Sequence, residues 1–321
     1  MQRSELEPIM RIGARGSPLS LAQTGQLRAL LADALGIPSA EIEDRLPIIP
    51  ITTTGDRIQD RPLSEAGGKG LFTKELDDAL LEGRIDCAIH SLKDVPTQLP
   101  DGIVLLAGPE RENRRDALVT VAGMGLSDLK QGAVIGSASL RRAAQLLHAR
   151  PDLTIVSLRG NVGTRLEKLK AGQCDATLLA AAGLARLGYS DVPHVLLDPV
   201  AMPPAIGQGA LAITARAGDA ATASAFAKIA DPVTEIEVAA ERAFLTALDG
   251  SCRTAIGALA SLDAAGTLTF IGEALQADGQ ERWRCDGTLT HATKDKAEAL
   301  GTELGHKVKE MAGNAFAGAH G

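Results

Sequence analysis

Arginines dominate the chemistry that this sequence can offer. Six of them fall between Arg141 and Arg186, and most stand beside Gly, Ser or Thr in turn-like contexts such as SASLRR, LRGNVGTR and GLARLG. A guanidinium binds a planar carboxylate through two parallel N–H bonds, so the pattern indicates a site for a small polyacid. A solvated surface charge is the commoner explanation for any single arginine. Several in successive loop and helix-start positions favour a ligand, because helix N-termini disfavour cations.

Two further positions could take part in a reaction. The segment HSLKDVP places Lys93 and Asp94 at the end of an apolar strand, where a carboxylate could transfer protons and stabilise a developing cation. A turn-forming Asp before Pro96 is an equally good interpretation of the residues alone. Cys252 lies in a Gly-Ser-Cys-Arg loop beside a cation that favours the thiolate, although most lone cysteines only fill space in a core.

The composition argues against several classes of protein. The 321 residues carry a net charge of -7 and only 2% are aromatic, whereas nucleic-acid binding needs a basic face and stacking side chains. No stretch approaches the ~18 apolar residues of a membrane helix, and none reads as a signal peptide, so we expect a cytoplasmic protein without membrane contact. The four cysteines are dispersed, which predicts free thiols and no metal site.

An internal repeat predicts the architecture. RIGA runs into ARGSPLSLAQTGQLRALL, and later AVIG runs into SASLRRAAQLLHA; both read as strand, Ser-containing loop and helix with an Ala-Gln step. A second unit in each half ends in Gly-x-x-Asp and a buried strand, with the acids at Asp86 and Asp175. Such an order forms parallel sheets whose ligands bind beyond the carboxyl ends of the strands. We therefore expect two α/β lobes with a cleft between them, lined by the segments that follow these strands.

The remaining sequence predicts the division into domains. We expect a first domain at 1–108 and 205–230, a second at 109–204, and a third, small α+β domain at 231–321 with three strands and a last helix from about Lys294. The long polar stretch from Ile51 to Gly67 has no expected secondary structure, which is typical of a lid.

Seven segments of the chain closely resemble the porphobilinogen deaminase (hydroxymethylbilane synthase) family: ARGSPLSLAQ, GGKGLFTKEL, HSLKDVP, IGSASLRR, LRGNVGTRL, PAIGQGA and ERAFLTALDGSC. The resemblance implies a cytoplasmic, monomeric transferase of tetrapyrrole, porphyrin and heme biosynthesis, with no obligatory protein partner. Its reaction condenses four porphobilinogen molecules head to tail, with release of ammonia, into the linear tetrapyrrole hydroxymethylbilane. The implied fold is two lobes like type II periplasmic binding proteins plus a small α+β domain with a three-stranded antiparallel sheet.

The resemblance also assigns roles to residues. Cys252 is expected to carry a dipyrromethane cofactor through a thioether. Asp94 is expected to be the catalytic carboxylate, which assists loss of ammonia and stabilises the azafulvenium cation. The residues expected to bind the cofactor are Lys93, Asp94, Ser137, Ser139, Arg141 and Arg142. Those expected to bind substrate are Arg15, Ser17, Arg159, Arg165, Arg186 and Gln208. Lys69 and Phe72 are expected in the lid or its loop. Three positions depart from the family pattern, namely Ala138, Ser251 and Ala255.

Two other functions are alternatives to this one. A non-catalytic, two-lobed polyacid-binding protein predicts a secretion signal and no third domain, and the sequence fits neither expectation. A transferase of the phosphoribosyl type predicts an acidic pair and a phosphate loop, and neither is evident.

Overall fold

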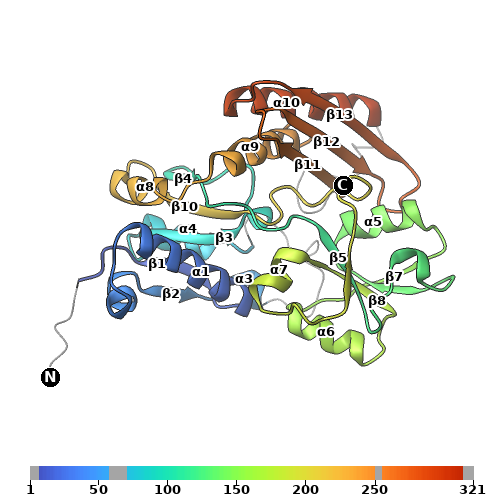
Figure 1. Ribbon diagram of the computed structural model, residues 1–321, viewed down its shortest axis with the longest axis horizontal. Helices are drawn as coiled ribbons and strands as arrows, with labels where there is room; N and C mark the ends of the chain where they lie inside the picture. Colours follow the sequence, from blue (N-terminus) through green and yellow to red (C-terminus); the bar gives the residue numbers. More distant parts are fainter. Residues whose placement is uncertain (1–6, 58–70, 250–254, 314–321) are drawn as a thin grey trace. The chain divides into compact units, whose positions relative to one another are not determined.

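The computed structural model describes residues 7–57, 71–249 and 255–313 (Figure 1). The chain divides into two compact units. Unit 1 comprises residues 1–111 and 210–234, and unit 2 comprises residues 112–209 and 235–321. None of the helices in the described ranges is long and apolar enough to span a membrane.

Unit 1 is built on a five-stranded sheet in the order β2-β1-β3-β10-β4. The first three strands are parallel, and β10 runs antiparallel to both of its neighbours. The strands are β1 (Ile12–Arg15), β2 (Ile48–Ile51), β3 (Cys87–Ser91), β4 (Ile103–Leu106) and β10 (Leu211–Arg216). The helical elements are α1 (Pro18–Ala34), η1 (Ser39–Glu41), α2 (Ile42–Arg45), α3 (Thr54–Arg57), α4 (Lys74–Leu81), η2 (Leu92–Asp94) and α8 (Ala220–Ala227).

Helices cover both faces of this sheet, because the side chains of β3 alternate between two cores. Ile89 packs in a cluster with Leu27 of α1 and Phe226 of α8. The adjacent Ala88 packs in a second cluster with Leu76 of α4. A strand that is buried on both faces has a continuous apolar sequence, and the Cys-Ala-Ile segment at the start of β3 is such a run.

The stretch from Ile51 to Gly67 was expected to lack secondary structure, and this is wrong at its start. α3 forms at Thr54–Arg57 because the Thr54 backbone N–H donates to Glu75 Oε1 at 2.8 Å and Gly55 N–H donates to the Leu71 carbonyl at 2.8 Å. These contacts with a segment distant in sequence are not visible in the local pattern.

Unit 2 contains a second five-stranded sheet with the same topology, in the order β7-β6-β8-β5-β9. Here β5 is the antiparallel strand in fourth place. The strands are β5 (Asp116–Thr120), β6 (Val134–Gly136), β7 (Thr154–Val156), β8 (Ala176–Ala180) and β9 (His194–Leu196). The helical elements are η3 (Leu126–Asp128), α5 (Leu140–Ala149), α6 (Val162–Lys170) and α7 (Ala181–Arg186).

The repeated Gly-x-x-Asp motif has the same structural role in both lobes. Asp86 accepts the backbone N–H of Arg11 at 2.8 Å, and Asp175 accepts that of Val134 at 2.8 Å. Each Asp directly precedes a buried strand and binds the start of the neighbouring parallel strand. The motif therefore fixes strand register and belongs to the scaffold.

The last part of unit 2 is a three-stranded antiparallel sheet, β11-β12-β13. Its elements are α9 (Pro232–Ala247), β11 (Ala255–Leu262), β12 (Leu268–Leu275), β13 (Arg282–Leu289) and α10 (Lys294–Ala312). Phe244 of α9 and Phe270 of β12 meet with ring centroids 5.3 Å apart. A Cβ on Gly301 of α10 would lie 2.1 Å from the Ala240 carbonyl oxygen, so glycine lets the two helices pack closely. The expected fold class, two α/β lobes and a small α+β part, is confirmed.

Candidate active site

Unit 1 has a pocket where β1 and β3 end. The loop after β1 supplies Arg15, and Ser17 begins α1 by accepting the N–H of Ser20 at 3.3 Å. Asp94 ends the helical turn η2 that follows β3. The pocket is lined by Arg15, Ser17, Leu19, Ser20, Gln23, Phe72, His90, Ser91 and Asp94. Four residues predicted from the sequence therefore lie together, at the carboxyl ends of parallel strands where α/β sheets bind ligands.

Charges in this pocket are distributed unevenly. Asp94 is exposed and is the acidic side chain among the lining residues. The Arg15 guanidinium lies over the Phe72 ring, 4.1 Å from its centroid. Burial, together with repulsion from Arg15, lowers the pKa of His90 to about 4. The His90 imidazole, whose Nε2 is 3.3 Å from Thr214 Oγ1, is therefore uncharged at neutral pH. Lys93 precedes Asp94 in the same turn and is half-buried.

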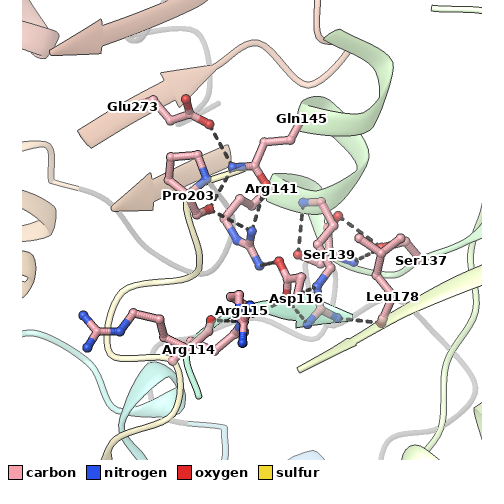
Figure 2. A network of polar contacts seen from close by, with 12 residues as sticks. Arg114, Arg115, Asp116, Ser137, Ser139, Arg141, Gln145, Leu178, Pro203 and Glu273 are labelled. Carbon is pink, nitrogen blue, oxygen red and sulfur yellow. Dashed lines mark hydrogen bonds and ion pairs between the residues drawn. The ribbon is translucent and has the colours of Figure 1, made fainter. Parts of the chain in front are cut away.

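Unit 2 buries an arginine pair, Arg141 and Arg142, in the first turn of α5 (Figure 2). Both bind the fully buried carboxylate of Asp116, Arg141 through Nη2 at 2.8 Å and Arg142 through Nη2 at 2.7 Å. Ser139 begins the helix by accepting the Arg142 N–H at 3.4 Å, and Ser137 Oγ accepts the Ser139 N–H at 3.2 Å.

Asp116 is ionised by its partners despite its burial. Burial alone would raise the pKa of Asp116, but the Arg141 and Arg142 guanidinium groups hold it well below its usual range. Gln208 Nε2 also donates to its Oδ1 at 2.9 Å. Two cations share one anion, so this cluster keeps an excess positive charge. Sequence reasoning missed Asp116; the available signal was an acid at the first position of an otherwise apolar strand, DALVT.

Two other predicted arginines of unit 2, Arg165 and Arg186, donate to backbone carbonyls. Arg165 Nε donates to the Gly160 carbonyl at 2.9 Å, and Arg186 Nη2 to the Gly209 carbonyl at 2.7 Å. Burial, together with repulsion from Arg142 and Arg159, lowers the pKa of Arg165 to about 10. Burial also lowers the pKa of Arg186. A carbonyl does not cancel a positive charge, so this lobe favours an anionic ligand.

Two family profiles match the chain. "Porphobilinogen deaminase, dipyromethane cofactor binding domain" covers residues 10–224, and "Porphobilinogen deaminase, C-terminal domain" covers residues 235–310. The chain belongs to the porphobilinogen deaminase family. A porphobilinogen deaminase of Caulobacter vibrioides strain NA1000 is 56% identical over 317 residues, covering 97% of this chain and 98% of the relative. One of Phenylobacterium zucineum is 54% identical over 317 residues, with the same coverage of both chains.

Family membership confirms the function expected from the sequence. A member of the porphobilinogen deaminase family is a transferase that condenses four porphobilinogen molecules into hydroxymethylbilane, using a dipyrromethane cofactor. The alternative of a non-catalytic polyacid-binding protein is thereby excluded. Among solved structures, the periplasmic VFT2 domain of Bordetella pertussis BvgS matches with 17% identity and a TM-score of 0.40, covering 68% of this chain and 86% of that one.

The residues of unit 2 fit the cofactor of the porphobilinogen deaminase family. A dipyrromethane built from two porphobilinogen molecules brings four carboxylates. The arginine pair carries excess positive charge, and its Arg141 Nε–H is buried with no acceptor among the described residues. Within the described ranges, no group of His, Cys, Asp and Glu side chains could hold a metal ion.

Three predicted positions lie outside the described residues, namely Lys69, Ser251 and Cys252. Elements on both sides of the cysteine are defined, since α9 ends at Ala247 and β11 begins at Ala255. The other two departures from the family pattern are described: Ala138 is exposed in the loop before α5, and Ala255 is buried at the start of β11.

Proposed function

We propose that Asp94 is the catalytic carboxylate of this porphobilinogen deaminase and that Cys252 carries the dipyrromethane cofactor through a thioether. The observation that supports Asp94 most is its exposure in the unit 1 pocket, where it is the acidic lining residue. Arg15 and Ser17 share this pocket and supply partners for the acid groups of a substrate. We also propose a cytoplasmic monomer of three domains, 1–108 with 205–230, 109–204 and 231–321.

The arginines of unit 2 divide into two groups in this proposal. The arginine pair, with Lys93, Ser137 and Ser139, binds the acid groups of the cofactor. Arg159, Arg165 and Arg186, with Gln208, bind the substrate and the growing chain. Each porphobilinogen adds two carboxylates, and a charge-assisted hydrogen bond stabilises by ~1.5–3 kcal/mol. Lys69 and Phe72 belong to the loop that closes over the substrate.

The bound cofactor supplies the free pyrrole end to which each substrate ring is joined. The Asp94 carboxylic acid gives its proton to the amine of the substrate, which leaves as ammonia, and the carboxylate that remains stabilises the positive charge that develops on the substrate pyrrole. Negative charge close to a developing cation is worth most in a site that excludes water. The uncharged His90 adds no competing positive charge.

The decisive experiment is the mass of the intact, freshly purified protein. We expect the mass of the chain plus two linked pyrroles, and digestion should place the addition on the peptide that contains Cys252. An unmodified mass in fully active enzyme would remove Cys252 from this role.

Asp94→Ala tests the catalytic carboxylate. We expect a loss of turnover of about 10²–10⁴, the usual contribution of a positioned acid or base, with the cofactor still attached. Asp101→Ala, which removes an exposed carboxylate of the same unit, is the control. Turnover of the Asp94→Ala variant within a few-fold of that control would contradict the assignment.

The roles of the arginine pair are tested by the yield of cofactor-loaded protein. Arg141→Leu and Arg142→Leu should each accumulate apoprotein. Arg150→Leu is the control because Arg150 follows the same helix but pairs with Asp152 at 2.7 Å. Equal loading in all three variants would exclude the pair from cofactor binding.

A further inference from the structure

The side-chain amide of Gln145 links the arginine pair to the C-terminal sheet (Figure 2). Its Nε2 donates to Glu273 Oε1 and to the Pro203 carbonyl, both at 2.8 Å. Its Oε1 accepts from Arg141 Nη1 at 2.8 Å. The opposite orientation of the amide would turn its oxygen toward a carboxylate and a carbonyl. Glu273 and the Pro203 carbonyl therefore together determine which end of the amide faces Arg141, and Glu273 is the charged one of the two acceptors.

Glu273 is itself held firmly on β12. Its side chain is fully buried, and its Oε2 lies 3.2 Å from Arg284 Nη1. Arg284 also donates through Nη2 to the Val200 carbonyl at 2.7 Å. A buried charge that loses its partners is strongly destabilising, so the Glu273 carboxylate stays where it contacts both Arg284 and Gln145.

The Gln145 amide is closely packed against the C-terminal sheet. A Cβ on Gly257 would lie 2.6 Å from the Pro203 carbonyl oxygen and 3.1 Å from Gln145 Nε2. Ala144, beside Gln145, packs with Ala255 and Leu275 of the C-terminal sheet. Gly257 and Ala255 belong to the strand that follows the Cys252 segment, so α5 is fixed directly against the strand next to the cysteine.

The orientation of Arg141 is imposed by these contacts. Its Nη1 bonds to Gln145 and to Pro203, and its Nη2 bonds to Asp116. The remaining Nε–H is buried and has no acceptor in the part of the chain that is described. An unsatisfied buried donor is destabilising, so the surrounding groups hold this guanidinium where it would not settle by itself.

We propose that Glu273 is a positioning residue for cofactor binding: by fixing the Gln145 amide, it holds Arg141 in the orientation that binds an acid group of the cofactor. The inference rests on the proposed role of the arginine pair. Without the carboxylate only the Pro203 carbonyl still accepts from the Gln145 NH₂. A larger fraction of the molecules then has the amide turned over, with its NH₂ facing a guanidinium that also donates. Arg141 loses a partner and moves, and the cofactor binds less tightly.

The test is cofactor loading of apoprotein by porphobilinogen, followed by intact mass. Replacing Glu273 with Leu (E273L) removes the acceptor at similar volume, and we expect the porphobilinogen concentration for half-maximal loading to rise about tenfold, which corresponds to one lost charge-assisted bond. Glu273→Gln keeps one side-chain oxygen that can accept from Gln145, so its porphobilinogen concentration for half-maximal loading should lie between those of E273L and wild type. Leu304→Ala is the control, because it opens a cavity in the core of the same unit without touching this network.

A second measurement separates positioning from a general loss of stability. Gln145→Leu should raise the loading concentration as E273L does, and the double variant should be no worse than either single variant, because both break one connection. The inference would be overturned if the effects of E273L and Gln145→Leu add in the double variant. It would also be overturned if E273L and Leu304→Ala need the same porphobilinogen concentration for half-maximal loading. Wild-type protein that loads no pyrroles would instead overturn the proposed function. If E273L does not fold, Glu273→Gln against Leu304→Ala decides the question.

Discussion

Asp116→Asn is the most informative single change in unit 2. Asn keeps the shape of the side chain and one carbonyl oxygen, but it removes the charge that Arg141 and Arg142 share. Both arginines are buried, with 5% and 6% of their surface exposed, so neither can recover its hydration without movement of α5. The substitution leaves two buried cations with a neutral partner.

The expected loss of stability is large. Removing one partner of a buried ion pair costs about 3–5 kcal/mol. With a urea dependence of ~2–3 kcal/mol per molar for a unit of this size, the unfolding midpoint should fall by about 1–2.5 M. Because the pair is shielded from solvent, the difference from wild type should change little between low and high salt.

The assay is urea unfolding followed by tryptophan fluorescence. The chain has one tryptophan, Trp283, and it lies in β13, so the signal reports on the unit that holds Asp116. Asp175→Asn is the matched control. Asp175 belongs to the same unit and pairs with Lys130 at 2.8 Å, but that lysine is 69% exposed. Asn at this position keeps a side-chain oxygen that can accept the Val134 N–H, so the substitution removes the charge and leaves the strand contact. An exposed pair contributes ~0–1 kcal/mol, and salt should reduce even this.

The pH dependence gives an independent check. The pKa of Asp116 is depressed in the folded protein, so its contribution is present above its unfolded pKa and is lost as the pH falls through the folded pKa. The difference between wild type and Asp116→Asn should therefore be constant from about pH 5 to 8 and shrink below about pH 4. An Asn variant within about 1 kcal/mol of wild type at neutral pH would refute this account of the cluster.

Further predictions concern the scaffold. Gly301→Val should lower the free energy of unfolding by ~1–3 kcal/mol or more, the usual cost of an overpacked contact, and so lower the urea midpoint. The reason is that its Cβ would lie 2.1 Å from the Ala240 carbonyl oxygen. Gly25→Ala in α1, where nothing lies within 4 Å, should instead raise the stability of unit 1 by ~0.5–1 kcal/mol, and a loss there would contradict the packing. Burial raises the pKa of Asp77 to about 6, so the neutral acid is favoured in the folded state and wild-type stability should fall as the pH rises from 4 through 6. Asp77→Asn should remove this dependence of stability on pH and be about 1–3 kcal/mol more stable than wild type at pH 8, as measured by unfolding midpoints. Stability profiles that run parallel for the two proteins between pH 4 and 8 would count against the prediction.

The scaffold could be predicted from the sequence because its signals are local. Alternating and helical periods, the serines before α1 and α5, and the two Gly-x-x-Asp motifs each occupy a few consecutive residues. The prediction of an α/β unit needs no knowledge of what the element later packs against. α3 was missed for the same reason, since its helical turn depends on Glu75, far along the chain.

The polar network could not be predicted because its partners are distant in sequence. Arg141 and Asp116 are separated by 25 residues, and Gln145 and Glu273 by 128. Nothing around Glu273 marks it as buried, since β12 contains both exposed and buried side chains. The arginine cluster predicted a bound anion, but it gave no sign that a protein carboxylate already binds two of the arginines.

The two lobes show how one scaffold position acquires different chemistry. Gln23 and Gln145 stand at the same place, six residues after the serine that begins each helix. Gln23 accepts from Ser91 Oγ at 3.0 Å beside Asp94, whereas Gln145 binds Arg141 and Glu273. The difference begins with the antiparallel strand in fourth place, which enters each sheet at the ligand end.

In unit 2 that strand begins with Asp116, opposite Ala180 at the end of β8, and in unit 1 it begins with Leu211, opposite Ser91 at the end of β3. An acid at this entry point can hold two buried arginines, which a leucine cannot. Unit 1 keeps its exposed carboxylate, Asp94, on the neighbouring turn instead. The repeat therefore supplies the frame for both lobes, while the first residue of the antiparallel fourth strand differs between them and lets unit 2 hold two buried arginines.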